Sequence, residues 1–489
     1  MLATLTATVA SGKPLAARPR LVLVAALAVM VVMAVWAQPA RAGWSAPATI
    51  SAPHDQIGAL QLASGPFGDL LSWKYWDLVG SRGIFGAPGA RLAVAGPGGS
   101  FSRERRLPSS YATGPLVDLG QGHVAQLTFV PSAGNTTALE VRLGEVDGRF
   151  GAAQRIRASM WAARASLAGN WRGELLLAWI SSPRSGHRQV WASTRPAGGR
   201  FGPPQLLSAR ANGLSVTAAV GPAAHRTDLG GFASDMVVAF DSKRGRMLAR
   251  VRPHLRPWGP VQDIGPAAVG SDNEVAPPSI GRDGRVTIAW YHEQLSEGGP
   301  LGPGYVQVAV LPPGAHRFQA AQTLERDPPS VGVGGEPRVV ADDGHGRIVA
   351  FLAHPSAPAG GMVAPAVVKV AYGKGSRFGA PRRISPAGQD AGDLSAAEGE
   401  RGEILSWIRE DPPSHADGTV YVAIDEPPEN GLGAPQQASP PEHVSVAVPA
   451  YSPSSGRWIV AWAGRPLYQT MFAPGPMLVR ESFCPEPCR

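Results

Sequence analysis

The chain has 489 residues, of which 60 are glycine and 48 are proline, and only 17% carry a charge. No strict glycine period runs through it, which excludes a collagen-like protein, and the presence of one long apolar run excludes a multi-pass membrane protein. The hydrophobic fraction of 44% is enough for a large core, so we expect the glycines and prolines to punctuate a fold rather than to mark disorder.

The N-terminus has the pattern of a secretory signal peptide over residues 1–42. Two basic residues, Arg18 and Arg20, precede an uninterrupted apolar run of 16 residues at 21–36, and residues 40–42 fit a small-x-small cleavage site. A run of this length is shorter than the roughly 20 residues that a helix needs to cross a bilayer, so cleavage is favoured over a retained anchor. The sequence therefore predicts a secreted protein, extracellular or associated with the cell envelope, with no membrane span after cleavage.

The charge of the remaining chain is small. The predicted signal peptide holds four basic and no acidic residues, so the formal charge of +8 falls to +4 once it is removed. No run of Lys or Arg interrupts the rest of the sequence, which argues against a nucleic-acid partner.

A short phrase recurs along the whole predicted mature chain: an aromatic residue, roughly three positions later Ala or Pro, and three positions after that Ile or Leu. The eight copies begin at Trp44, Phe101, Phe150, Phe201, Trp258, Phe318, Phe378 and, in degenerate form, Leu432. Their spacings are 57, 49, 51, 57, 60, 60 and 54 residues. A period of this size is typical of propellers and other repeat architectures.

A second phrase lies between the copies of the first and consists of a few aliphatic or small residues that end in an aromatic one. The eight aromatic ends are Trp73, Phe129, Trp179, Phe240, Trp290, Phe351, Trp407 and Trp462. These segments are too short for helices and rich in β-branched residues, so they predict buried strands whose aromatic ends fill the core. A glycine usually precedes them, at 173, 284, 346, 402 and 456, where a positive φ would suit a tight hairpin.

Two further candidate strands in each unit bring the total to four, which we name A to D in chain order. Four strands in units of about 56 residues predict an all-β fold, a single eight-bladed β-propeller of four-stranded antiparallel blades over residues 43–480. Seven blades is the alternative, should the poorly matching second or fourth unit be something else. Because the chain starts with a D phrase and ends with an A-B-C set around Val446, Trp462 and Tyr468, we expect the N-terminal strand to join the last blade and close the ring.

The repeat resembles secreted bacterial propellers that are grouped with sialidase-like (BNR) proteins. The resemblance covers residues 43 to about 480 and rests on the regular spacing of the predicted blades. The sialidase Asp-box, Ser-x-Asp-x-Gly-x-x-Trp, is absent: in the nearest stretch, Ser279 to Trp290, the Ser and Asp are two residues too far apart. Sialidases also use an arginine triad with a Tyr/Glu pair, and no residue of this chain is assigned to that set.

Aromatic residues outside the blade pattern give the best site prediction. Tyr75 and Trp76 fall on the predicted B–C loop of the first unit, Tyr111 on the loop entering the second, and Trp161 on the loop entering the third. Since these connections share one face of a propeller, the four rings are predicted to form a shelf for a sugar ring or an apolar partner. The alternative is that each ring covers the edge of a neighbouring blade.

The B–C loops differ in length, being long at 74–90, 291–304 and 352–366 and short at 241–245. His292 and Glu293 on one long loop are added to the predicted ligand-binding residues. Other polar positions in the same connections are Asp272, Asn273, Glu274, Glu410, Asp411, His415, Glu442 and His443. Carboxylates paired across the channel could act as acid and base on a glycosidic bond, whereas solvated loop charge is the simpler interpretation. No ligand spacing for a metal occurs, so no cofactor or metal is predicted and the catalytic residues stay unknown.

The only two cysteines are Cys484 and Cys488, within a C-terminal tail assigned to residues 481–489. After export we expect them to form a disulfide that closes a very small loop. The function predicted from the sequence is a monomeric extracellular binding module for a protein, glycan or envelope component. A sialidase-like glycoside hydrolase and a structural envelope scaffold are the two alternatives.

Overall fold

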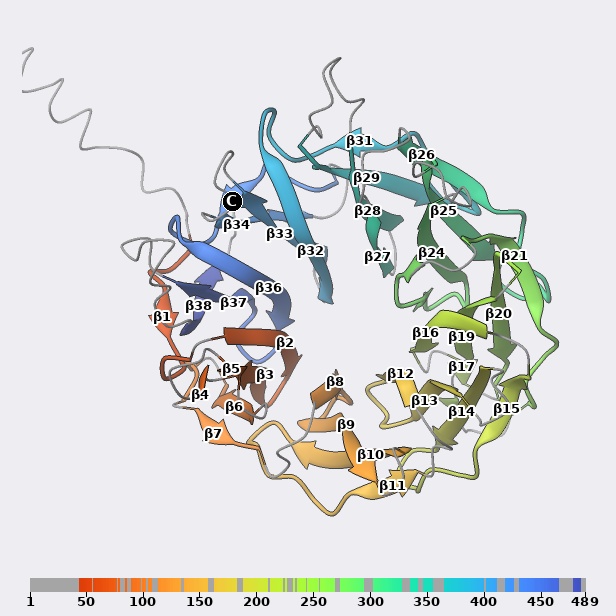
Figure 1. Ribbon diagram of the computed structural model, residues 1–489, viewed down its shortest axis with the longest axis horizontal. Helices are drawn as coiled ribbons and strands as arrows, with labels where there is room; N and C mark the ends of the chain where they lie inside the picture. Colours follow the sequence, from red (N-terminus) through yellow and green to blue (C-terminus); the bar gives the residue numbers. More distant parts are fainter. Residues whose placement is uncertain are drawn as a thin grey trace, which may run out of the picture.

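The predicted strands assemble into eight antiparallel sheets, each with four strand positions, arranged as a ring around a central channel (Figure 1). The eight-bladed propeller is therefore confirmed and the seven-bladed alternative is wrong. The computed structural model describes residues 44–484 except 55, 77, 80–83, 86–88, 98, 103, 108–112, 133–135, 157–161, 183–187, 210–211, 223–224, 227–231, 234, 243, 255, 269–272, 294–301, 328–334, 342–345, 355–364, 400–401, 411–417, 426–430 and 466–477.

The first four blades follow the chain without crossovers, from the innermost strand A to the outermost strand D. Blade 1 consists of β2 (Gln56–Gly65), β3 (Gly68–Trp76), β6 (Gly89–Ala95) and β7 (Arg105–Arg106). Blade 2 consists of β8 (Thr113–Asp118), β9 (His123–Ser132), β10 (Thr136–Glu145) and β11 (Gln154–Ile156). Blade 3 consists of β12 (Ala162–Gly169), β13 (Leu175–Ser181), β14 (Gln189–Arg195) and β15 (Gln205–Ser208). Blade 4 consists of β16 (Asn212–Val220), β19 (Met236–Ser242), β20 (Arg246–Arg252) and β21 (Gln262–Pro266).

The remaining blades repeat this order, with two split strands. Blade 5 has a divided inner strand, β22 (Glu274–Val275) and β23 (Ser279–Ile280), followed by β24 (Val286–Glu293), β25 (Gly304–Leu311) and β26 (Gln322–Asp327). Blade 6 has a divided outer strand after β27 (Gly335–Ala341), β28 (Arg347–Ala353) and β29 (Val367–Lys374), namely β30 (Arg377–Phe378) and β31 (Arg382–Arg383). Blade 7 consists of β32 (Asp390–Gly399), β33 (Gly402–Glu410), β34 (Gly418–Ile424) and β35 (Gln436–Gln437), and blade 8 of β36 (His443–Ser452), β37 (Arg457–Arg465), β38 (Leu478–Cys484) and β1 (Ala48–Thr49).

The two ends of the propeller meet in blade 8, as the sequence predicted. β1 pairs antiparallel with β38, Ala48 opposite Glu481, and the Ile50 amide donates to the Val479 carbonyl (2.9 Å). One detail differs from the prediction: the third strand of this blade is β38 rather than a strand around Tyr468, a residue that lies outside the described ones. β38 thus brings residues 481–484, assigned to the tail, into the last blade.

The core lies between the blades. Buried hydrophobic residues among those described form eight clusters, one at each of the eight blade-to-blade interfaces. The B-strand aromatics are at the centre of this core, because seven of the eight predicted ones are at most 1% exposed: Trp73, Trp179, Phe240, Trp290, Phe351, Trp407 and Trp462. Strands β13, β19 and β28 are buried at every position, since each has a neighbouring blade on both faces.

The glycines that precede the B strands adopt the positive φ that the hairpin requires. The values are 81° at Gly173, 79° at Gly284, 146° at Gly346, 142° at Gly402 and 64° at Gly456. An L side chain is strained in this region, which explains why glycine recurs at these turns.

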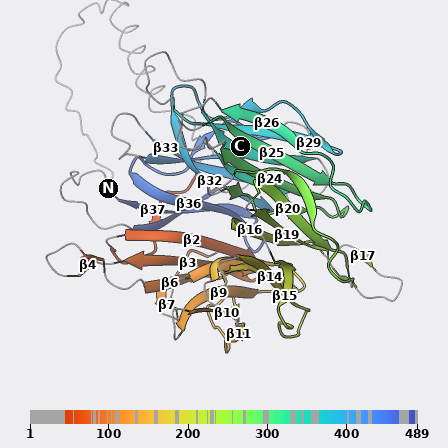
Figure 2. The same cartoon turned by 45° about the vertical axis from the view of Figure 1, so that its right-hand side comes forward.

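The connections divide the molecule into two faces. B–C and D–A connections lie on one side of the ring, which we call the loop face, and A–B and C–D connections lie on the other, the turn face. Two small hairpins mark them in Figure 2: β4 (Leu78–Val79) with β5 (Ile84–Phe85) in the B–C connection of blade 1, and β17 (His225–Arg226) with β18 (Phe232–Ala233) in the A–B connection of blade 4. Among the described residues, no helix has the length and apolarity needed to cross a membrane.

Candidate functional site

The wall of the channel is formed by the inner strands, and most of these strands break their pairing near the loop face. The register shifts between Gly58 and Gln61 in β2, for example, and similar shifts occur in β8, β12, β16, β27, β32 and β36. A β-bulge leaves backbone amides unpaired and turns a side chain away from the regular alternation. In blades 6 and 7 the bulge residues Glu336 and Asp393 have positive φ, 41° and 48°.

Acidic side chains accept from backbone amides in or next to these bulges, and each reaches from one blade to the next. The Glu336 amide donates to Glu274 Oε2 of blade 5 (2.5 Å), and the Leu394 amide donates to Glu336 Oε2 of blade 6 (2.6 Å). The Ala447 amide of blade 8 donates to Asp393 Oδ2 of blade 7 (2.8 Å). Three consecutive interfaces are therefore joined by a carboxylate on the channel wall.

Burial changes the proton affinity of two of these carboxyl groups. Burial raises the pKa of Asp393 to about 6, although its hydrogen bond from Ala447 and the nearby Arg338 act in the opposite direction. Burial also raises the pKa of Glu274, assisted by the negative charge of Glu336. The positive charge of Arg338 lies close enough to favour the ionised form of both groups.

A cavity of about 430 Å³ opens on the channel wall across blades 3 to 6. Its polar lining consists of Arg164, Ser215, Thr217, Asn273, Glu274, Glu336 and Arg338. The Thr217 hydroxyl is buried and has no hydrogen-bond partner among the described residues. The cavity thus combines two guanidinium groups, two carboxyl groups and a hydroxyl that can bind a ligand, in a volume within the roughly 300–1,000 Å³ of small-molecule sites.

A buried network fixes the side of the cavity that blades 4 and 5 form. Asn273 Nδ2 donates to Asp241 Oδ2 (2.8 Å), and the Ser215 amide donates to Asp241 Oδ1 (2.9 Å). The Ser215 hydroxyl donates to the Asn273 carbonyl, and the Ala268 amide donates to Asn273 Oδ1 (2.8 Å). Because Asn273 is 1% exposed and its contacts span two blades, this side of the cavity is preformed.

The predicted aromatic shelf is only partly within the described residues. Tyr111 and Trp161 lie outside them, as does the side chain of Trp76. Tyr75 and Trp76 belong to β3 and not to a loop, which corrects the predicted boundary of that strand. The Tyr75 ring is half-buried, stacks on His54 (centroids 4.0 Å apart) and has the Arg91 guanidinium 4.6 Å from its centroid, so it packs within its own blade and the shelf stays a prediction.

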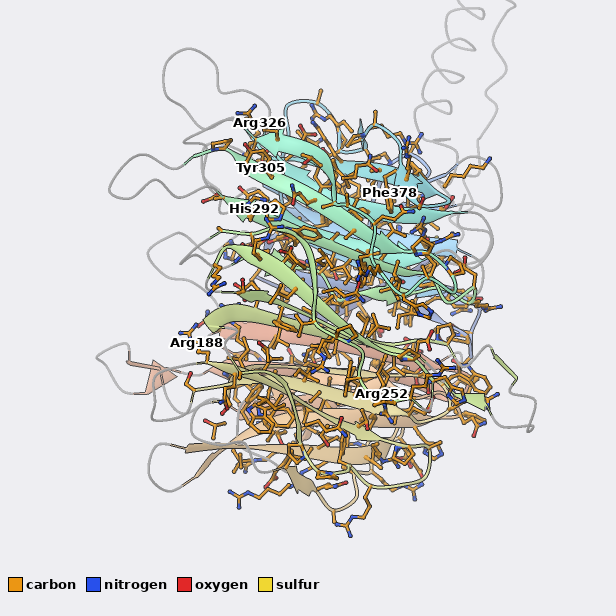
Figure 3. All side chains as sticks on the ribbon, turned by 90° about the vertical axis from the view of Figure 1, so that its right-hand side faces the viewer. Arg188, Arg252, His292, Tyr305, Arg326 and Phe378 are labelled. Carbon is orange, nitrogen blue, oxygen red and sulfur yellow. The ribbon has the colours of Figure 1, made fainter. Side chains whose placement is uncertain are left out.

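His292 and Glu293 belong to the end of β24, whereas the sequence placed them on a loop. His292 is 4% exposed and stacks on Tyr305 of β25 (centroids 5.3 Å apart), with Arg326 on the following strand (Figure 3). Burial lowers the pKa of His292 to about 4, which keeps the ring neutral. His292 is thus a core residue, and its burial leaves no surface for a ligand.

Glu293 forms a pair with Tyr291 at the same strand end. The Tyr291 hydroxyl donates to Glu293 Oε1 (2.9 Å), and burial followed by the charge of Glu293 raises the pKa of Tyr291 well above its usual range. Since Tyr291 is 6% exposed, its phenol stays protonated and enclosed. Neither group lines the channel cavity described above.

The other predicted polar residues are distributed around the ring. Glu442 is 2% exposed, accepts a hydrogen bond from the Trp462 indole and lies 3.3 Å from Arg480, so it is a core carboxylate and not a solvated one. Asp272, Asp411 and His415 lie outside the described residues. In the part of the chain that the structure describes, no group of three or more His, Cys, Asp or Glu side chains could hold a metal ion.

Cys484 ends β38, is 1% exposed and is disulfide-bonded. Its expected partner Cys488 lies outside the described residues, so the predicted pairing stays a prediction.

Five polar residues of the cavity were missed by the sequence analysis: Arg164, Ser215, Thr217, Glu336 and Arg338. They lie on inner strands that the sequence identified only as strands, because a β-bulge shifts the alternation of side chains that a strand pattern assumes. A signal was available in units 6 and 7, where Gly335-Glu336 and Gly392-Asp393 place an acidic residue directly after a glycine at the same point of the inner strand.

Comparison with known proteins gives no family. No protein-family model matches the chain, and no curated protein matches it. Among solved structures, the chain is similar to an ulvan lyase of polysaccharide lyase family PL25, with 8% identity over 75% of this chain and 90% of that one and a TM-score of 0.43.

Two further likenesses are of the same kind. A protein of unknown function from Dyadobacter fermentans is 10% identical over 90% of this chain and 98% of its own, with a TM-score of 0.37. The sialidase of Trypanosoma rangeli is 11% identical over 79% of this chain and 56% of its own, with a TM-score of 0.32. These values describe a distant similarity of architecture and transfer no residue or activity to this chain.

Proposed function

We propose that the protein is an extracellular binding module that takes an acidic saccharide in the channel cavity. The observation that carries the proposal is the position of Arg164 and Arg338, which come from blades 3 and 6 and line the same cavity. Two guanidinium groups on different blades can each donate hydrogen bonds to a carboxylate, an arrangement that suits an acidic group on the ligand.

The rest of the lining suits the hydroxyl groups of a sugar. Thr217 offers a buried hydroxyl without a partner in the described structure. Glu274 and Glu336 each hold a backbone amide through one oxygen, and the remaining lone pairs can accept from ligand hydroxyls. Because the carboxyl groups are fixed by the neighbouring blade, the cavity is arranged before the ligand arrives, which lowers the entropic cost of binding.

Calorimetric titration of the full chain with oligogalacturonate, and with the neutral galactose oligomer of the same length, tests the proposal. We expect binding of the acidic oligomer that weakens with salt, because charge-assisted contacts are screened. Arg338→Ala and Thr217→Val should each weaken it about tenfold, as expected from the loss of one ligand hydrogen bond. Arg200→Ala, which removes an exposed guanidinium on the C–D connection of blade 3, is the matched control. Equal affinity for both oligomers, or an unchanged affinity of Arg338→Ala, would refute the proposal.

Cleavage of a glycosidic bond is the second candidate, and one observation favours it. Glu274 and Glu336 line the same cavity, and the raised pKa of Glu274 suits a proton donor beside a second carboxyl group. Against it, both groups already hold a backbone amide of the next blade. Incubation with the acidic oligomer, followed by detection of new reducing ends, separates the two functions: a binding module leaves the oligomer intact, whereas an enzyme loses activity in Glu274→Gln.

A further inference from the structure

Two aromatic side chains stand out of the surface on the turn face, on the side of the ring away from the mouth of the channel cavity. Among the described residues only four large hydrophobic side chains are exposed, and the two aromatic ones are Phe67 (58%) and Trp171 (50%). Phe67 lies in the A–B turn of blade 1 and Trp171 in that of blade 3, and these blades flank blade 2 in the ring (Figure 1).

The A–B turn of blade 2 lies between the two rings and touches both residues. A Cβ on Gly122 would lie 3.2 Å from the Phe67 side chain, and one on Gly120 would lie 2.8 Å from the backbone of Trp171. The turn is held by Asp118, whose Oδ1 accepts from the Gly120 amide (2.9 Å). Gly120 and Gly122 are buried and pack against the two aromatic residues, so the exposed Phe67, Gln121 and Trp171 come from three successive blades that meet at this turn.

The turn that carries Trp171 is rigid. Asn170 Oδ1 accepts from the amides of Arg172 (3.1 Å) and Glu174 (3.2 Å), so the residue before Trp171 is bonded to two that follow it in the turn. Asn170 Nδ2 donates to the Gly221 carbonyl of blade 4 (3.1 Å), which ties the turn to the next blade. Arg172 lies over the indole, 4.5 Å from its centroid, and restricts the rotation of the ring.

Polar groups surround the indole in a shallow cavity of about 400 Å³, lined by Gln121, Trp171, Arg172, Glu174 and Ala197. The amide of Gln121 can both donate and accept, Arg172 donates, and Glu174 accepts. Arg172 and Glu174 carry opposite charges, so the lining of this cavity has no net charge. An apolar ring in a neutral, hydrogen-bonding surround differs from the contiguous apolar core that a protein partner of comparable size would need.

We propose that this surface, made of Phe67, Gln121, Trp171, Arg172 and Glu174, binds a neutral polysaccharide of pyranose units with mostly equatorial hydroxyl groups. The axial C–H bonds of such a ring form an apolar face that carries a slight positive charge, which is complementary to the negative face of an indole or phenyl ring. The equatorial hydroxyls then point sideways toward Gln121, Arg172 and Glu174. Phe67 and Trp171 on either side of one turn would hold two units of the same chain. This site is separate from the channel cavity and does not depend on the function proposed for it.

Native gel electrophoresis of the full chain through gels that contain hydroxyethylcellulose tests the proposal. We expect the protein to be retarded by this neutral polymer, with Trp171→Ala and Phe67→Ala each weakening the apparent affinity about tenfold and Trp171→Phe less. Leu206→Ala and Val261→Ala remove exposed hydrophobic side chains elsewhere (41% and 42% exposed) and should leave retardation unchanged. Thermal unfolding of each variant checks that it is folded. We expect all of them to fold, because these exposed side chains do not belong to the core.

The outcomes separate this site from the channel cavity and from a protein partner. Arg338→Ala should leave retardation by hydroxyethylcellulose unchanged, and Trp171→Ala should leave titration with oligogalacturonate unchanged. Absence of retardation, or equal retardation of the wild type and Trp171→Ala, overturns the proposal. A different result would be a wild type that is not retarded, together with a Trp171→Ala variant whose sedimentation coefficient is lower than that of the wild type. In that case the surface is a protein interface and the polysaccharide proposal is wrong.

Discussion

The Ser452 hydroxyl of blade 8 donates a hydrogen bond to Asp69 Oδ2 of blade 1 (2.9 Å), across the interface between the last and the first blade. Asp69 is 2% exposed and Ser452 is fully buried. A second buried carboxylate, Glu481 of β38, accepts from the Phe101 amide at the same interface (3.3 Å). The interface between the last and the first blade therefore contains two carboxyl groups that have been removed from water.

This interface makes the stability of the propeller depend on pH. Burial raises the pKa of Asp69 to about 6 and that of Glu481 to about 7. Because both values lie above those of the unfolded chain, the folded state binds protons more tightly. The stabilisation is complete below about pH 4 and is lost as the pH rises toward 7. We therefore expect a higher melting temperature at pH 5 than at pH 8. Three further buried carboxyl groups, with pKa values raised to about 6, contribute in the same direction: Asp118, Asp327 and Asp393.

Glu481→Gln isolates the contribution of one group. The amide oxygen can still accept from Phe101, but nothing titrates, so the variant should be more stable than the wild type at pH 8 and show a smaller difference between pH 5 and pH 8. Glu145→Gln, at an exposed position (50%), is the control and should keep the wild-type difference. A wild-type melting temperature that does not change between these pH values would contradict the assignment.

The bulge carboxylates predict a second effect on stability. Glu336→Ala leaves the Leu394 amide without its acceptor, which should cost about 1–3 kcal/mol in the free energy of unfolding. Glu336→Gly also removes the acceptor but relieves the strain of φ 41°, so it should be less destabilising than the alanine variant by about 1 kcal/mol. Denaturant unfolding measures both, and the reverse order of the two variants would show that the positive φ carries no strain.

The fold was predictable because its signals repeat. Eight segments end in an aromatic residue, such as Trp290 or Trp462, and each indicates the buried B strand of one blade. One poor copy, as in unit 2, therefore does not hide the pattern. The site was not predictable in this way, since it is made from single residues on different blades. Arg164 and Arg338 are 174 positions apart in the chain, and only ring closure and the bulges bring them to one cavity.

Strand ends were the other source of error. His292 and Tyr75 follow the aromatic residue of a B strand by two positions, and the sequence analysis placed the strand end at that aromatic residue, where the recurring phrase ends. In the structure both strands continue, because the polar rings stack on neighbours, His292 on Tyr305 and Tyr75 on His54. A polar ring that stacks on a neighbour can remain in a strand, and a short recurring phrase does not contain that contact.

Five of the eight D phrases carry a glutamine four residues after their first residue, and its role appears only in the structure. The Gln322 side chain donates to the Phe378 carbonyl (2.7 Å) and accepts from the Phe378 amide (3.0 Å), so it completes an antiparallel-like pair with the D phrase of the next blade. Gln322→Ala should cost about 1–3 kcal/mol in the free energy of unfolding. Gln205 has the same place in blade 3 but is exposed, so Gln205→Ala should cost less than about 0.5 kcal/mol. Equal losses in the two variants would mean that the pair across the blades contributes nothing.

The turn beneath Trp171 gives a last prediction, in which strain and steric crowding are separated. Gly120 and Gly198 have nearly the same φ, 69° and 68°, so alanine at either position carries the same backbone strain of about 1 kcal/mol. A Cβ on Gly198 would meet no atom within 4 Å, whereas one on Gly120 would lie 2.8 Å from backbone atoms of Trp171. Gly120→Ala should therefore lower the free energy of unfolding by clearly more than Gly198→Ala, and it should also weaken retention by hydroxyethylcellulose because Trp171 has to move. If Gly120→Ala unfolds like Gly198→Ala and keeps full retention, the turn of blade 2 does not set the position of Trp171.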